Sequence, residues 1–237
     1  MSHAFGGLAS ETINGQDATV FNSGITAAGG SATWAASTDF KADGTVTGAD
    51  SDAARLNLGT YINASMGTAT GKFSLTATLN PISGGGADFL SLGYFTGPID
   101  LGEDFASDTN KYAVATAVTR VSSDGISDYF KGPGAANSID HVEGRGLRTY
   151  TLDFDFTPEG GYDGVSNFGT MTFHSDNDSG SVSRVLNSAQ NIQYIGITRD
   201  DSVQGAFSNF QLTQIPEPGS FVLVFVGGLF LVARRRR

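Results

Sequence analysis

The chain has 237 residues, of which 24 are acidic and 14 basic, and it contains no cysteine. Residues 1–215 hold 23 of the acidic and 10 of the basic residues, so this part carries a formal charge of −13. Such an acidic body is repelled by nucleic acid and by anionic lipid, which argues against nucleic-acid binding. The lack of cysteine excludes disulfide bonds and thiol chemistry.

Residues 1–17 are glycine-rich and lack the features of a secretory signal peptide. They contain no basic stretch and no adequate apolar run. We expect a poorly ordered lead-in, and a true start upstream of Met1 that supplies the signal peptide. A non-standard export route, or a protein that is never exported, is the alternative.

Alternating apolar and polar residues recur along residues 18–213, which predicts β-strands. The expected strands are residues 18–25, 72–79, 89–95, 112–118, 148–156, 168–174, 191–199 and 206–213. Clusters of glycine, proline, asparagine and aspartate separate them, and no segment of the body offers three turns of helical periodicity. The fold class is therefore all-β: an antiparallel, jelly-roll-like β-sandwich over residues 18–213, followed by one short C-terminal hydrophobic helix.

Acidic residues alternate along one predicted strand, in the pattern Asp153-x-Asp155-x-x-x-Glu159. The pattern is similar to the Glu-x-Asp strand motif of jelly-roll glucanases, with aspartate in the first position. Paired carboxylates about 5–5.5 Å apart serve retaining glycosidases as acid and nucleophile. The other interpretation is a strand whose apolar residues face the core and whose carboxylates face solvent. We favour the second, and predict no catalytic residue and no enzymatic activity.

Metal and cofactor sites are weakly indicated. Asp176 and Asp178, and the pair at residues 50–52, offer oxygen ligands for calcium, but neither segment matches the twelve-residue calcium loop. The favoured interpretation is hydrated turns, so no metal and no cofactor is predicted. The histidines show no metal-ligand spacing, which argues against zinc: His3, His141 and His174.

Aromatic side chains suggest a second kind of site. Trp34, Tyr94, Tyr129 and Tyr162 offer flat faces on which a sugar ring could stack. Core packing for the tryptophan, and anchoring of loops for the tyrosines, is the simpler interpretation.

The C-terminus contains three consecutive signals. The motif at residues 215–219 includes Pro216, Glu217 and Pro218, whose prolines favour an extended backbone. An apolar helix is expected over residues 220–233, with a basic stop at residues 234–237. The membrane segment comprises Phe221, Val222, Leu223, Val224, Phe225, Val226, Leu229, Phe230, Leu231 and Val232, and the stop comprises Arg234, Arg235, Arg236 and Arg237.

The apolar run is short for a membrane span. Residues 221–233 form a helix of roughly 20 Å, whereas the hydrocarbon core of a bilayer is about 30 Å thick. Residues 219–220 can lengthen the helix, and the arginines can extend to the interface. The positive-inside rule then places the arginines in the cytoplasm and residues 1–215 across the membrane.

This order of signals closely resembles the PEP-CTERM sorting signal of Gram-negative, exopolysaccharide-producing bacteria, a signature also catalogued as an ice-binding-protein C-terminal domain. The resemblance implies processing by an exosortase, a membrane-embedded transpeptidase that recognises the region around Pro216, Glu217 and Pro218. The strand order, the segment 89–95 and the closing segment 206–213 resemble concanavalin-A-like or laminin-G-like domains.

These features together predict an exported protein of the cell surface or extracellular matrix. It is held in the membrane by its C-terminal helix until processing, and acts structurally or adhesively in a polysaccharide envelope. A calcium-assisted, lectin-like carbohydrate-binding module and a jelly-roll glycoside hydrolase are the alternatives.

Overall fold

The structure is a computed structural model, and it describes residues 9–11, 22–27, 30–37, 45–46, 52–83, 88–98, 102, 113–122, 125–131, 137–142, 147–176, 181–199 and 204–215. The C-terminal helix predicted for residues 220–233 lies outside these ranges. Within the described ranges, no helix has the length and apolar character needed to cross a membrane.

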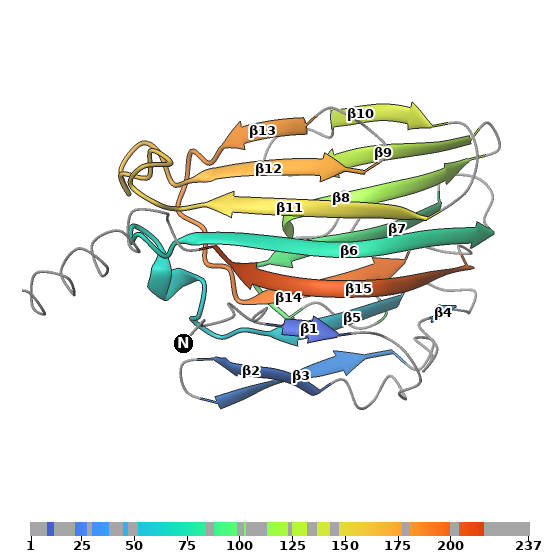
Figure 1. Ribbon diagram of the computed structural model, residues 1–237, viewed down its shortest axis with the longest axis horizontal. Coiled ribbons are helices and arrows are strands. Elements are labelled where there is room, and N and C mark those ends of the chain that lie inside the picture. Colours follow the sequence, from blue (N-terminus) through green and yellow to red (C-terminus); the bar gives the residue numbers. More distant parts are fainter. Residues whose placement is uncertain are drawn as a thin grey trace, which may run out of the picture.

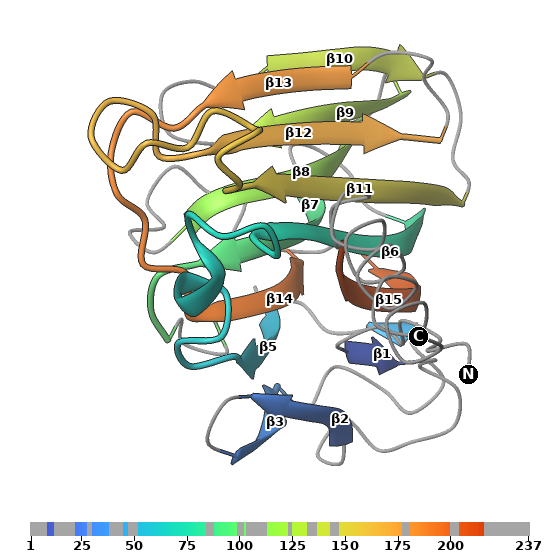
Figure 2. The ribbon, with the colours of Figure 1, turned by 60° about the vertical axis from the view of Figure 1, so that its left-hand side comes forward.

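Two antiparallel sheets form a sandwich (Figures 1 and 2), which confirms the predicted all-β fold class. The β6 sheet has the order β1 (Ala9–Glu11), β15 (Gln204–Gln214), β6 (Lys72–Ser83), β11 (Arg148–Asp155), β12 (Thr170–Ser175) and β13 (Ser181–Val185), with β4 (Thr45–Val46) also paired to β15. The β7 sheet has the order β10 (Asn137–Val142), β9 (Gly125–Lys131), β8 (Ala113–Ser122), β7 (Asp88–Phe95), β14 (Tyr194–Arg199), β5 (Asp52–Asn57), β3 (Gly30–Ala36) and β2 (Asn22–Ala27). The 3-10 helix η2 (Asn63–Ser65) lies in the connection from β5 to β6.

The core lies between the two sheets and is rich in aromatic residues. Phe154 of β11 packs edge-on against Tyr94 of β7, with ring centroids 4.5 Å apart, and stacks on Phe156 at 5.0 Å. All three rings are fully buried. Because side chains alternate along a strand, the same arrangement turns Asp153 and Asp155 to the outer face of the β6 sheet.

A β-bulge in β15 changes which residues reach the core. The register of β15 on β6 shifts between Ser208 and Gln211, and Asn209 adopts a positive φ of 53°. Phe207 and Phe210 are three residues apart, so regular alternation would turn them to opposite faces, yet both are buried. The extra residue in the bulge therefore lets both rings enter the core.

The N-terminal strand β1 pairs with β15, where Ala9 lies opposite Leu212. It falls within residues 1–17, for which a lead-in was predicted. Most of that segment lies outside the described residues, so the domain boundaries at residues 17 and 213 stay a prediction.

Candidate functional site

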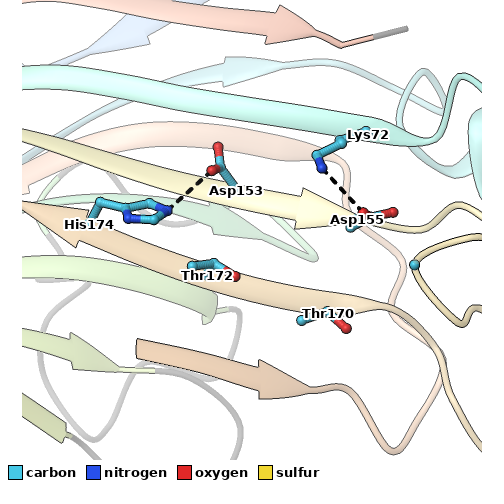
Figure 3. A pocket seen from close by; sticks show the side chains of 7 residues that line it. Lys72, Asp153, Asp155, Thr170, Thr172 and His174 are labelled. Carbon is cyan, nitrogen blue, oxygen red and sulfur yellow. Dashed lines mark ion pairs between the residues drawn. The ribbon is translucent and has the colours of Figure 1, made fainter. Parts of the chain in front are cut away.

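A hollow of about 420 Å³ lies on the outer face of the β6 sheet, where β6 begins and β11 ends. It is lined by Lys72, Asp153, Asp155, Gly160, Thr170, Thr172 and His174 (Figure 3). Apart from Gly160, every lining residue has a polar side chain, so the hollow offers hydrogen-bond donors and acceptors together.

Strand register brings these residues together from distant parts of the sequence. Asp155 lies opposite Lys72 of β6 on one side and Thr170 of β12 on the other. Asp153 lies opposite Thr172 of β12. Because each strand turns alternate residues outward, all these side chains occupy one face.

The Asp155 carboxylate is held by three contacts. Its Oδ1 atom accepts hydrogen bonds from the Thr157 hydroxyl at 2.6 Å and from the Thr157 backbone N–H at 3.0 Å. Its Oδ2 atom lies 3.4 Å from Lys72 Nζ. Burial raises the pKa of Asp155, but the Thr157 hydrogen bonds and the Lys72 charge outweigh it, so the pKa lies below the ordinary value.

Gly160 borders the hollow next to the Asp155 carboxylate. A Cβ atom on Gly160 would clash with Asp155 Oδ1, so a larger residue would displace the carboxylate. The Gly160 N–H donates to the Thr157 hydroxyl at 3.0 Å, which completes a chain of hydrogen bonds to Asp155. The position of Asp155 thus depends on the turn that follows β11.

The Asp153 carboxylate pairs with His174 of β12, and the distance from Oδ2 to Nε2 is 3.4 Å. Both side chains are partly exposed. On the opposite face of the sheet, the Tyr94 hydroxyl donates to the Leu152 carbonyl at 3.3 Å. Burial, and then the negative charge of Asp153, raise the pKa of Tyr94 well above its ordinary value.

Hydroxyl pairs continue the polar surface beyond the hollow. The pairs join neighbouring strands of the β6 sheet: Thr76 with Thr151 (3.2 Å), Thr78 with Thr149 (3.2 Å) and Thr172 with Ser183 (2.8 Å). The outer face of this sheet therefore presents hydroxyl groups around the charged hollow.

The loop after β11 is organised by Asp163. Its Oδ1 atom accepts from the backbone N–H groups of Val165, Ser166 and Asn167, and its Oδ2 atom accepts from the Ser166 hydroxyl at 2.7 Å. These hydrogen bonds, led by that from the Asn167 N–H, lower the pKa of Asp163. The loop that borders the hollow is thereby fixed by its own hydrogen bonds.

We expect acid to weaken the fold partly through Asp155. Its pKa is lowered by folding, so its charged form stabilises the fold above about pH 4, the ordinary range of an aspartate, and that contribution disappears as the pH falls through the lower folded value. Asp155→Asn should reduce the free energy of unfolding by about 1–2 kcal/mol at pH 7. The loss of stability between pH 5 and pH 2, measured by urea unfolding, should be smaller in the variant than in the wild type.

The matched control for this measurement is Glu159→Gln, which removes an exposed carboxylate that does not line the hollow. Equal pH dependence of the wild type and Asp155→Asn would contradict the assignment.

The structure separates the three carboxylates of the predicted acidic motif. Asp153 and Asp155 line the hollow together, whereas Glu159 is exposed outside it. Sequence analysis did not identify four of the lining residues as site residues: Lys72, Gly160, Thr170 and Thr172. It considered His174 only as a zinc ligand. The adjacency of Lys72 and Asp155 follows from register, which alternation within each strand does not specify.

The aromatic candidates are corrected in part. Tyr94 is fully buried and cannot stack on a sugar. Tyr162 is half-buried and packs edge-on against Phe156, with centroids 6.4 Å apart. The side chains of Trp34 and Tyr129 lie outside the described part of the structure.

Of the two calcium candidates, the structure describes Asp176 and not Asp178. The Asp176 carboxylate accepts from the Thr149 N–H at 2.8 Å, which ties the end of β12 to β11. Asp178 lies outside the described residues, as do His3 and the side chain of His141. Among the described residues, no group of three or more histidine or acidic side chains could hold a metal ion.

The structure describes the chain up to Ile215, so the sorting motif, the apolar run and the arginines lie outside it. A family model of the PEP-CTERM protein-sorting motif matches residues 214–237, about a tenth of the chain. The motif indicates an exported, envelope-associated protein. No curated protein matches the chain.

Comparison with solved structures bears on the body. The carbohydrate recognition domain of Emp47p is 11% identical, with a TM-score of 0.52, over 90% of this chain and 99% of that chain. The metal-free carbohydrate recognition domain of Emp46p is 14% identical (TM-score 0.48; 77% and 87% covered). An alginate lyase from Pseudomonas aeruginosa is 10% identical (TM-score 0.43; 69% and 73% covered). Of these three, the Emp47p domain alone supports the fold assignment. The chain therefore carries a PEP-CTERM protein-sorting motif behind a body with an antiparallel β-sandwich fold similar to that of the Emp47p carbohydrate recognition domain.

Proposed function

We propose that this is an exported envelope protein that an exosortase-type transpeptidase processes at its C-terminal tail, and whose body then holds polysaccharide at the cell surface. The observation that carries the proposal is the match of residues 214–237 to the sorting motif. The membrane holds the protein through residues 220–233 before processing. The body acts structurally or adhesively afterwards.

The hollow on the β6 sheet supports the polysaccharide part of the proposal. A sugar hydroxyl both donates and accepts hydrogen bonds, and the hollow offers the acceptors Asp153 and Asp155 beside the donors Lys72 and His174. The two carboxylates and the acidic body disfavour anionic polymers. A neutral polysaccharide is therefore the expected ligand.

The hollow is better suited to binding a polysaccharide than to hydrolysing one. A general acid needs a carboxyl group whose pKa is raised, so that it is protonated at neutral pH. The pKa of Asp155 is lowered instead, by Thr157 and Lys72 acting against burial. Asp153 is paired with His174, and Glu159 lies outside the hollow. Release of reducing ends from a polysaccharide, abolished by Asp155→Asn, would overturn this assignment.

The binding proposal predicts the behaviour of a hollow variant. Asp153→Ala removes an acceptor from the hollow, and we expect about tenfold weaker binding to a neutral dextran or mannan, equivalent to about 1.4 kcal/mol. Gln211→Ala is the matched control, because Gln211 is exposed on β15 of the same sheet and does not line the hollow. Alginate should bind more weakly than the neutral polymers.

Calorimetry with and without EDTA measures these affinities and also tests the calcium-assisted alternative. Equal affinity of the Asp153→Ala variant and the wild type would contradict the hollow as the binding site. Absence of binding to every polymer would contradict the polysaccharide part of the proposal.

A further inference from the structure

The last strand remains paired up to Ile215, the residue before Pro216 of the sorting motif. Gln214 of β15 lies opposite Phe73 of β6, and the Ile215 N–H donates to the Lys72 carbonyl at 2.7 Å. Pro216 is the next residue. No free linker therefore separates the folded body from the motif.

The Gln214 side chain fastens this end of β15 to the connection between β5 and β6. Its Oε1 atom accepts from the Tyr61 hydroxyl at 2.7 Å, and its Nε2 atom donates to the Thr70 carbonyl at 2.6 Å and to the Ser65 hydroxyl at 3.3 Å. The Tyr61 ring packs edge-on against buried Phe73. The end of β15, from which the tail starts, is thus held by β6 and by the connection between β5 and β6.

Covalent geometry then limits how far the motif can extend from the body. An extended chain advances at most about 3.6 Å per residue, so Pro218 lies within about 11 Å of Ile215. An enzyme that acts on residues 216–218 must approach the body closely, or must first release β15 from β6.

One segment beside the end of β15 carries no charge. Residues 59–70, which we call the collar, contain no charged residue, although the body as a whole carries a formal charge of −13. Thr60, Thr68, Ala69 and Thr70 are exposed. Backbone hydrogen bonds fix the collar, for example from the Gly67 N–H to the Phe156 carbonyl at 2.8 Å. Figure 1 shows its helical turn at the end of the sandwich where β6 begins.

We propose that the collar is the face that the folded body presents to the membrane-embedded processing enzyme. The proposal rests on the tail processing described under the proposed function. The Gln214 hydrogen bonds hold the end of β15 against the collar, so an enzyme that acts on the adjoining motif contacts both at once. A neutral collar lets an acidic body approach the enzyme at the membrane surface without repulsion from anionic lipid.

The test introduces charge into the collar of the full-length protein, in cells that contain the processing enzyme. Thr60→Glu with Ala69→Glu adds two carboxylates and leaves the Gln214 hydrogen bonds in place. We expect release of the tail, followed by pulse-chase, to slow at least tenfold. Leu147→Glu is the matched control, because this exposed residue precedes β11 at the opposite end of the sandwich. It should change the rate less than twofold.

A spacer variant distinguishes the loss of contact between the collar and the enzyme from a general defect in tail processing. Eight glycine and serine residues inserted between Ile215 and Pro216 span about 15 Å and should restore processing of the doubly charged variant. Melting temperatures confirm that each variant is folded. Unchanged processing of the doubly charged variant would overturn the collar proposal, and so would failure of the spacer to rescue it. Retention of the tail by the wild type would instead overturn the proposed function.

Photo-crosslinking identifies what touches the collar. A photo-reactive amino acid in place of Ala69 should crosslink to the processing enzyme, and the same residue in place of Leu147 should not. Crosslinks from position 69 to lipid alone would overturn the proposal, because the membrane rather than the enzyme would then cover this face.

Discussion

Replacement of Pro216, Glu217 and Pro218 by alanine is expected to leave the C-terminal tail attached to the protein. The prolines disfavour helix and keep this segment extended, as a protease or transpeptidase requires of its substrate. Alanine is the strongest helix former, so the variant segment can join the predicted helix at residues 220–233. We expect processing to fall by at least a hundredfold.

Cell fractionation and intact-mass spectrometry measure this effect. The wild type should lose the mass of the tail and leave the membrane fraction, whereas the triple alanine variant should retain both the mass and the membrane location. Ser220→Ala lies just beyond the motif and is the matched control. Normal processing of the triple variant would show that the motif does not direct sorting.

Replacement of Phe154 by alanine should have the largest effect on folding. The ring is fully buried and contacts both Tyr94 and Phe156, so its removal leaves a cavity between the two sheets. Such truncations cost about 3–5 kcal/mol in well-packed cores. Because Phe154 lies between Asp153 and Asp155 in β11, the same change should also loosen the hollow.

Urea unfolding monitored by fluorescence measures the loss. Val185→Ala is the matched control, because Val185 is 60% exposed on β13 and its truncation should change the free energy of unfolding by less than about 0.5 kcal/mol. A loss below about 1 kcal/mol for Phe154→Ala would mean that the two sheets do not pack around this ring as described.

The strands that alternate clearly in sequence could be predicted, and the weakly patterned ones could not. Residues 72–79, 89–95 and 148–156 correspond to β6, β7 and β11, whose inward side chains are large and apolar. β5 buries two alanines and one leucine, and β13 lies at the sheet edge with exposed alternate residues, so neither gives a strong pattern. These strands were missed for that reason.

The hollow was predictable only in part. Alternation along residues 148–156 indicates that Asp153 and Asp155 share a face, and the structure places them there. The partners Lys72 and His174 come from strands whose pairing with β11 depends on long-range register. A shift by one residue would turn each to the opposite face, and no local signal in the sequence fixes it.

Lys72 and Ile215 give the body a defined response to mechanical load. The carbonyl of Lys72 holds the start of the tail, while its ammonium group lies in the hollow on the neighbouring strand. The tail and the hollow therefore lie at the same end of the sandwich, where β15 ends and β6 begins. Because the two strands are antiparallel, a pull between the tail and a polymer held in the hollow loads the Ile215–Lys72 hydrogen bond first and the following bonds of the β15–β6 ladder in turn. The start of β15, which is paired with both β6 and β4, is loaded last.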